Sequence, residues 1–163
     1  MTAAPEIADE LRRLRTRVPQ VTGVLAAGVD GLVLAHDTPG VEPEGMAALT
    51  ATALAVALRM ADTTGRGDFR ELLVRGENGY VATYAAGRTA VLTVLAQDRV
   101  NVGRLHLEGR RTGARIGAIV DAAEQRAAPV REPAPARSPS RLPSRPRTAR
   151  TTATTNARTT TES

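Results

Sequence analysis

The feature that most constrains the fold is an apolar segment at residues 43–63, whose spacing predicts a helix that ends before Gly65. Two apolar stripes run along it, namely Met46, Leu49, Ala53, Val56 and Met60, and Ala47, Ala51, Leu54, Leu58 and Ala61. After Glu44 the segment has two charged residues, Arg59 and Asp62. A helix that is apolar around most of its circumference has to be buried on more than one side. A domain of this size has one core, so the second side predicts another partner, and self-association is the simplest candidate.

Periodic patterns place the other elements on both sides of this segment. Helices are predicted at residues 5–17 and 102–127, and strands at 21–29, 32–36, 69–75, 80–86 and 89–96. Because the first and fifth strands are apolar on both faces, they are predicted to be central in a sheet. Arg70, Glu71 and Arg75 place the third strand at a sheet edge.

Glycine positions predict the turns and one packing contact. Asp30-Gly31 predicts a two-residue turn between the first two strands, and Asn78-Gly79 and Gly87-Arg88 predict the later turns. In the last helix, Gly109, Gly113 and Gly117 are four residues apart, which predicts close backbone packing on the sheet. Each glycine lowers helix propensity by about 1 kcal/mol, so some fraying of this helix is expected.

The net charge of +5 belongs to the C-terminal tail. Residues 1–127 contain 15 Arg and 15 Asp plus Glu, whereas residues 128–163 contain seven Arg and two Glu. The tail also has six Pro and eight Thr and no aromatic residue, so it is predicted to be disordered. Three interpretations stay open: a solubilising linker, a docking segment for an acidic partner or nucleic acid, and a phosphorylation switch among Ser138, Ser140 and Ser144.

Missing residue types narrow the chemistry. The chain has no Cys, and residues 1–127 have no Ser or Lys, which excludes a serine, cysteine or Schiff-base lysine nucleophile there. His36, Asp37, His106 and Glu108 are too few and too scattered to predict a metal or acid–base site. Arg66-Gly67-Asp68 is better interpreted as a glycine-rich connection than as an integrin-type tripeptide. We therefore expect no enzyme activity, no metal and no cofactor.

No basic-then-apolar leader opens the chain, and no run approaches the ~18 apolar residues of a membrane span. A cytoplasmic protein without membrane contact is the expectation.

The element order α-β-β-α-β-β-β-α and three sequence blocks resemble the Roadblock / dynein light chain family. The blocks are VPQVTGVLAAGVDGLVLA, EGMAALTATALAVALRMA and ENGYVATYAAGRTAVLTVLA. The resemblance covers roughly residues 5–125. It implies an α+β fold of the profilin-like or longin-like kind, with a five-stranded antiparallel sheet in the order 2-1-5-4-3. One helix is expected on one face of the sheet and two on the other.

The resemblance also implies a homodimer, in which the middle helices pack together and the sheets join at their edges, and regulation of a Ras-like small GTPase. Candidate dimer-interface residues are Leu49, Ala51, Leu54, Leu58, Phe69 and Leu73. Candidate partner-contact residues are Arg66, Arg70, Arg75 and Arg88. None is expected to be catalytic. The alternative is a passive dimeric scaffold whose basic tail recruits an acidic protein or nucleic acid.

Overall fold

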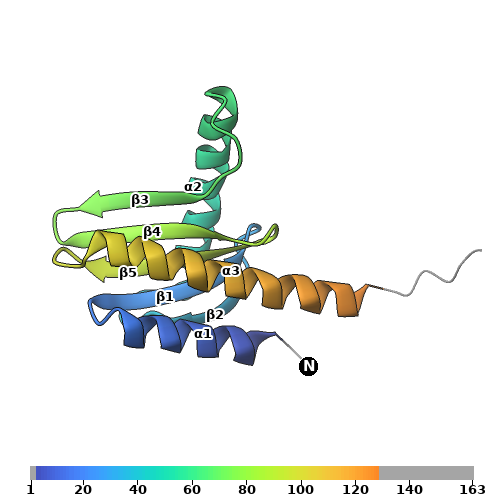
Figure 1. Ribbon diagram of the computed structural model, residues 1–163, viewed down its shortest axis with the longest axis horizontal. Coiled ribbons are helices and arrows are strands. Elements are labelled where there is room, and N and C mark those ends of the chain that lie inside the picture. Colours follow the sequence, from blue (N-terminus) through green and yellow to red (C-terminus); the bar gives the residue numbers. More distant parts are fainter. Residues whose placement is uncertain (1–2, 129–163) are drawn as a thin grey trace, which may run out of the picture. The chain divides into compact units, whose positions relative to one another are not determined.

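The computed structural model describes residues 3–128 (Figure 1). The predictions for the tail, residues 128–163, therefore fall almost wholly outside the described residues. The elements are α1 (Ala4–Arg17), β1 (Val21–Gly28), β2 (Val33–Asp37), α2 (Pro43–Thr63), β3 (Glu71–Gly76), β4 (Gly79–Ala86), β5 (Ala90–Gln97) and α3 (Val102–Ala127).

The five strands form one antiparallel sheet in the order β2-β1-β5-β4-β3. The predicted order is confirmed, with β1 and β5 in the centre and β3 at an edge. Helices α1 and α3 lie side by side on one face of the sheet, and α2 lies on the other (Figure 1). The predicted arrangement of one helix against two is therefore confirmed.

Two hydrophobic cores follow from these layers. The larger core joins α1 and α3 to the sheet, with Ile7, Leu14, Leu92, Leu105 and Ile116 buried within it. The smaller core joins α2 to β1 and β5 through Leu25, Ala27, Ala47, Leu54 and Val91. Helix α2 thus contributes two buried residues, Ala47 and Leu54, to the smaller core, which is few for a helix of 21 residues.

The first hairpin differs from the predicted two-residue turn. The amide of Gly28 donates to Leu32 O at 2.8 Å, which leaves three loop residues, Val29, Asp30 and Gly31. Gly31 adopts a φ of 85°, a conformation that glycine tolerates best, and its amide donates to Gly28 O. This is a turn followed by a left-handed residue, the usual three-residue hairpin.

Other element boundaries shift by one or two residues. The β3–β4 loop is Glu77-Asn78, with Gly79 paired to Gly76, so the prediction of Asn78-Gly79 was one residue late. Strand β3 begins at Glu71, and Phe69 and Arg70 precede it. The chain first turns through Gly65 and Gly67, both with positive φ, before it reaches the sheet.

Helix α3 is continuous from Val102 to Ala127, so the expected fraying is not seen. The predicted close packing is present, because a Cβ at Gly109 would collide with the Tyr84 ring and one at Gly117 with the backbone of Gly87. A Cβ at Gly113 would come within 2.6 Å of Ala85 O. Contact with the sheet therefore compensates for the low helix propensity of the three glycines.

Candidate interaction surface

Helix α2 is buried along a narrow side. Ala47, Thr50 and Leu54 face the sheet, and the Thr50 hydroxyl lies 3.0 Å from the Thr93 hydroxyl of β5. The C-terminal half of α2 extends past β3, away from the strands (Figure 1). The side of the helix that faces solvent remains strongly apolar.

That exposed side is formed by Leu49, Val56 and Met60, which are 67%, 56% and 64% exposed. The three residues follow the helical spacing i, i+7 and i+11, so they lie in one row. We call this row the α2 band. Large apolar side chains grouped on one exposed helix face are typical of a surface that binds a partner.

The sheet next to α2 is also partly uncovered. Val74 of β3 is paired with Val81 of β4, which is paired with Leu95 of β5. This row lies two residues from the Thr83–Thr93 pair, so it shares the sheet face that α2 occupies. Helix α2 packs mainly on β1 and β2 and reaches Val91 and Thr93 of β5. Val74 is 50% exposed. The α2 band and this row are therefore two apolar surfaces without cover within residues 3–128.

A hollow of about 440 Å³ lies where α2 approaches the loops at one end of the sheet. Leu58, Phe69 and Val29 form its apolar walls, and Asp68 and Arg88 lie at its rim. Its mixture of apolar and charged groups suits a protein contact better than a buried small molecule.

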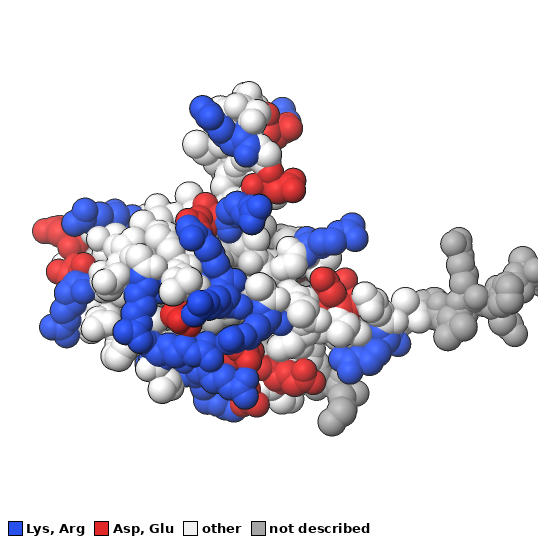
Figure 2. Space-filling view, in the orientation of Figure 1, with Lys and Arg blue, Asp and Glu red and all other residues white. Residues whose placement is uncertain are grey.

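On the other side of the domain, the outer surface of α1 and α3 is polar and rich in arginine. Figure 2 shows Arg side chains gathered over α1 and α3, interrupted by Asp and Glu. Many of these side chains form ion pairs, including Arg12–Asp9, Arg15–Asp37 and Arg110–Glu71. The side of the domain formed by α2 is thus apolar, whereas the side formed by α1 and α3 is charged.

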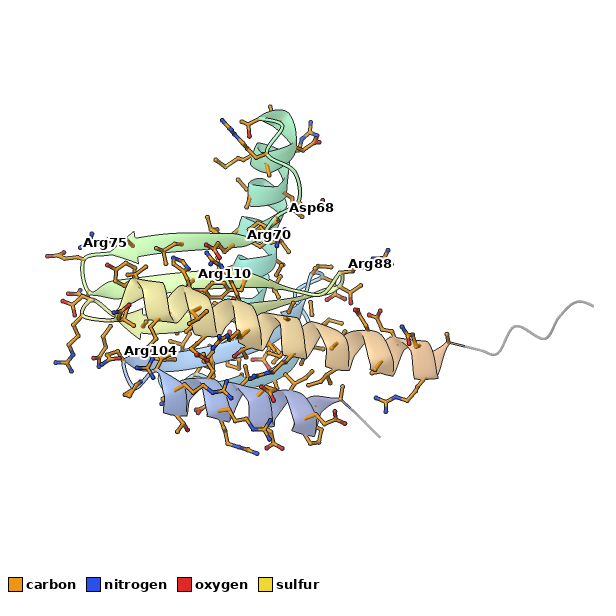
Figure 3. The ribbon with its side chains drawn as sticks, viewed as in Figure 1. Asp68, Arg70, Arg75, Arg88, Arg104 and Arg110 are labelled. Atoms are coloured by element: carbon orange, nitrogen blue, oxygen red, sulfur yellow. The ribbon has the colours of Figure 1, made fainter. Side chains whose placement is uncertain are left out.

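One ion pair ties α3 to the edge strand β3. Arg110 donates from Nε and from Nη2 to the two oxygens of Glu71, each at 2.6 Å (Figure 3). The hydrogen bond from Arg110 holds the pKa of Glu71 below its usual value of 4.5. A bidentate guanidinium–carboxylate pair of this kind fixes orientation as well as charge.

Tyr84 and His106 lie beside this pair. A hydrogen bond of 3.1 Å joins the Tyr84 hydroxyl to His106 Nδ1, and Glu71 Oε1 lies 3.7 Å from the same nitrogen. Burial, followed by the negative charge of Glu71, raises the pKa of the Tyr84 hydroxyl well above its usual value of 10. The tyrosine is therefore held neutral, which suits a structural hydrogen bond.

The second histidine is not part of this cluster. His36 lies on β2, and its Nδ1 is 3.5 Å from the Thr38 hydroxyl. Glu108 points to Arg17 and Arg111 instead of to His106, as the i, i+2 spacing predicts. Within residues 3–128 no group of three or more metal-ligating side chains comes together.

By length and composition, α2 is the one helix in the described part of the chain that would fit a membrane span. Core helices of sheet proteins pass the same test. In this structure Ala47, Thr50 and Leu54 of α2 pack on the sheet. The expectation of no membrane contact stays a prediction.

The sequence of residues 7–96 matches the family model of the Roadblock/LC7 domain. The match covers more than half of the chain. The chain belongs to the Roadblock/LC7 family. The resemblance stated from the three sequence blocks is confirmed.

Two curated relatives of this Roadblock/LC7 chain are the proteins MJ0310 and MJ1340 of Methanocaldococcus jannaschii. Each is 33% identical over 92 residues, which is 56% of this chain and 80% of the relative. Their names record no activity or partner.

Three solved structures have the same fold. A structure described as MglB with tetrameric arrangement has a TM-score of 0.70 at 23% identity and covers 76% of this chain and 93% of its own. The gliding protein MglB of Thermus thermophilus has a TM-score of 0.67 at 21% identity, covering 75% and 93%. A Roadblock/LC7 domain of Streptomyces avermitilis has a TM-score of 0.65 at 24% identity, covering 70% and 97%. At these identities the likeness shows the Roadblock fold.

The six predicted dimer-interface residues do not share one surface of the Roadblock domain. Leu49 and Leu58 are exposed, and Ala51 and Phe69 are partly buried. Leu54 is 5% exposed and belongs to the core beneath α2, so it is not free to contact a second chain. Leu73 points to the other face of the sheet and packs against the core under α1 and α3. Leu54 and Leu73 thus pack within one chain, on opposite faces of the sheet, and the sequence pattern did not show which side each residue faces. The role of the six residues in a dimer stays a prediction.

The four predicted partner-contact arginines are all exposed, but they are spread over the molecule. Figure 3 places Arg70 and Arg88 toward one end of the β3–β4 hairpin and Arg75 at the other. Arg75 lies over the Tyr80 ring, 5.6 Å from its centroid. Arg66 is in the loop after α2, where its amide donates to Ala61 O. Arg66, Arg70 and Arg88 are thus compatible with one contact, and Arg75 is not.

Two groups of residues were missed as candidates. Val56 and Met60 belong to an apolar stripe visible in the sequence, but the stripe facing the sheet was not distinguishable from the exposed one. No sequence pattern indicated Val74 or the Glu71–Arg110 pair, because the residues that surround them in the fold are distant in sequence.

Proposed function

We propose that this Roadblock/LC7 chain forms a homodimer which binds and regulates a Ras-like small GTPase in the cytoplasm, without a catalytic group of its own. The observation that carries the proposal is the exposed α2 band, Leu49, Val56 and Met60, beside the uncovered apolar row of the sheet. Family membership supports the choice of a GTPase as the partner.

A second copy accounts for both uncovered surfaces at once. The free half of α2 extends beyond the chain's own β3 (Figure 1), so in a two-fold arrangement it reaches over the partner's sheet. There it covers the row of Val74, Val81 and Leu95, while the partner's helix does the same in return. The α2 bands and the β3 edges then meet across the axis. A specific interface buries about 1,200–2,000 Å² of surface in total. One α2 helix and three strands from each copy can supply this area.

The end of the sheet near the hollow is the proposed contact for the GTPase. Arg88 lines the hollow together with Leu58 and Phe69, and Arg66 and Arg70 lie in the same connection between α2 and β3 as Phe69. Such a mixture of an apolar centre and a charged rim is typical of a regulated protein contact. Guanidinium groups can donate two hydrogen bonds to an acidic side chain of the partner. No arginine is assigned a role in hydrolysis.

The test is a pull-down with a small GTPase encoded beside this gene, loaded with GDP or with a GTP analogue. Binding to one nucleotide state, together with a changed rate of hydrolysis, supports regulation. If the GTPase binds in neither state and its hydrolysis is unchanged, the regulator proposal is wrong.

Paired substitutions locate the contact. Arg70→Ala with Arg88→Ala is expected to weaken GTPase binding by roughly tenfold, whereas Arg75→Ala, at the other end of the hairpin, leaves binding unchanged. An equal effect of both variants would place the contact elsewhere. Light scattering after gel filtration tests the dimer separately, and a monomer at micromolar concentration would contradict it.

A further inference from the structure

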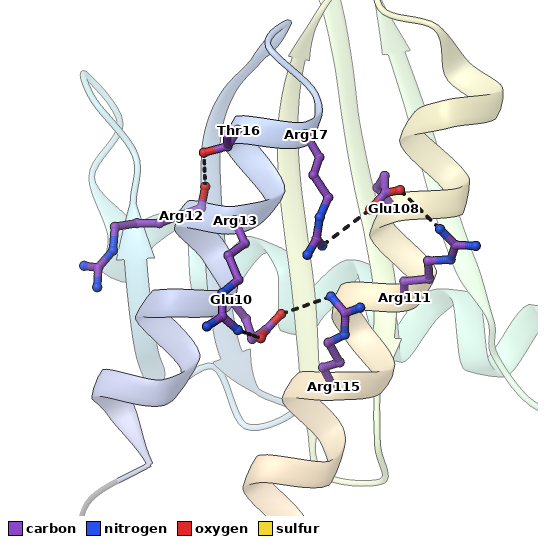
Figure 4. A network of polar contacts seen from close by, with 8 residues as sticks. All are labelled: Glu10, Arg12, Arg13, Thr16, Arg17, Glu108, Arg111 and Arg115. Carbon is purple, nitrogen blue, oxygen red and sulfur yellow. Dashed lines mark hydrogen bonds and ion pairs between the residues drawn. The ribbon is translucent and has the colours of Figure 1, made fainter.

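Four arginines on the outer side of α1 and α3 surround two carboxylates that are nearly buried (Figure 4). Glu10 accepts from Arg13 and, at 3.4 Å, from Arg115. Glu108 lies 3.5 Å from both Arg17 and Arg111. The side chains of Glu10 and Glu108 are 8% and 12% exposed. Four positive and two negative charges leave an excess of two positive charges on this group, which we call the arginine surface.

The guanidinium groups of the arginine surface are incompletely used. Three of the four arginine–glutamate contacts, those of Arg17, Arg111 and Arg115, are 3.4–3.5 Å long. Strong guanidinium–carboxylate bonds are shorter, at about 2.7–2.9 Å. Nη1 of Arg17, the atom that lies 3.5 Å from Glu108, is buried and forms no hydrogen bond within the described residues. The side chains of Arg13, Arg111 and Arg115 are 60%, 58% and 47% exposed, so a carboxylate from a partner can reach them.

A shallow hollow continues this surface along α1. It has a volume of about 430 Å³ and is lined by Asp9, Arg12, Arg13, Thr16 and Arg17. Arg13 and Arg17 therefore border the hollow and also contact the two carboxylates, Glu10 and Glu108.

We propose that the arginine surface docks an acidic segment of a partner protein. From Glu108 to Arg115, α3 advances by ~10 Å at 1.5 Å per residue, which an extended peptide covers with about three residues at ~3.3 Å each. A carboxylate of such a segment can bind the free donors of two neighbouring arginines.

The same observations disfavour two other polyanions. A membrane surface needs apolar side chains to insert, but among the described residues of α1 and α3 the only large, exposed apolar side chain is Leu107. Nucleic acid binding draws on many phosphate contacts and on stacking side chains. Here the excess charge is small, Asp9 lies among the arginines, and neither α1 nor α3 contains Phe, Tyr or Trp.

This inference does not depend on the proposed GTPase contact. The arginine surface lies on the α1–α3 side of the sheet, whereas the α2 band lies on the other side. A dimer can therefore present two arginine surfaces while its α2 helices are occupied.

The test measures fluorescence anisotropy of a labelled peptide of roughly six glutamates, with a glutamine peptide of equal length as the probe control. The full chain is compared with the double variant Arg111→Gln, Arg115→Gln. Each buried carboxylate keeps one arginine in this variant, Arg13 beside Glu10 and Arg17 beside Glu108. The control variant Arg99→Gln, Arg126→Gln loses the same charge outside the arginine surface. The basic tail is present in all three proteins, so its contribution is common to them.

The expected result is that Arg111→Gln with Arg115→Gln weakens glutamate-peptide binding by about tenfold and the control variant by less than about twofold. Binding of the full chain should also weaken with added salt. Equal affinities of the two variants would overturn the proposal. The proposal would also be overturned if Arg111→Gln with Arg115→Gln lost binding to phosphatidylserine vesicles or to single-stranded oligothymidylate but bound the glutamate peptide as tightly as the unmodified chain. Light scattering should show the same oligomeric state for all three proteins, which separates this result from a failure of the dimer.

Discussion

Arg110 of α3 and Glu71 of β3 lie 39 residues apart in sequence and share two hydrogen bonds of 2.6 Å. The pair holds the first residue of the edge strand against the last helix. It therefore joins the edge strand to a helix that covers the main core.

Glu71→Gln tests this pair through pH. Because the pKa of Glu71 is lowered by the bond from Arg110, its contribution to stability is complete above its ordinary pKa of 4.5 and is lost as pH falls through the lower, folded pKa. The wild type should be more stable than Glu71→Gln near pH 7, and the difference should shrink as pH falls below 4.5. Urea unfolding across this range measures it, and a difference that does not change with pH would contradict the assignment.

Tyr84 gives the opposite pH dependence. Its pKa is raised, mainly by burial, so its contribution to stability is complete below the ordinary value of 10 and is lost as pH rises through the folded value. In an alkaline titration followed by phenolate absorbance, Tyr84 should ionise only as the protein unfolds. Tyr84→Phe should remove this late phase and, since a hydrogen bond to His106 is lost, lower stability by about 1 kcal/mol. A titration with no late phase in the wild type would show that the hydroxyl is accessible.

Two arginine substitutions on α2 separate the core from the proposed dimer surface. Leu54→Arg places a charge in the core and should reduce stability by roughly 3 kcal/mol or more. Val56→Arg, two residues further on, should leave the fold intact and abolish self-association, because Val56 is 56% exposed. Circular dichroism and light scattering measure the two effects. If Val56→Arg remains dimeric, the α2 band is not the interface.

Glycine substitutions on α3 test its packing on the sheet. Gly113→Ala should cost about 2 kcal/mol, because the added Cβ would come within 2.6 Å of Ala85 O. Gly103→Ala is the matched control: its Cβ meets no atom closer than 3.4 Å, so the gain in helix propensity should stabilise the protein by up to about 1 kcal/mol. Thermal unfolding compares them, and equal effects would mean that α3 can shift without loss.

Local patterns were sufficient to place β1 and β5 in the centre of the sheet, and the family resemblance supplied the full strand order, but neither located the surfaces. Apolar residues on both faces of β1 and β5 marked them as central, and that property belongs to each strand by itself. The direction in which Leu54 or Leu73 points depends on how α2 and β3 are rotated against neighbours distant in sequence. The same holds for the contacts of Glu10 with Arg115 and of Glu71 with Arg110, where the two partners are 105 and 39 residues apart. Turn chemistry placed the first hairpin correctly but gave it a loop one residue too short.

The two outer strands of the sheet have a consequence for how far the protein can polymerise. Strand β2 is short, with five residues, and α1 packs beside it, joined by the Arg15–Asp37 ion pair. Strand β3 is the edge left open within the described residues. When two copies join through β3, both open edges are used, and each end of the combined sheet is a β2 strand that α1 shields. Growth then stops at a pair, so a chain with a bare strand and an apolar helix can remain in solution instead of extending into a fibre.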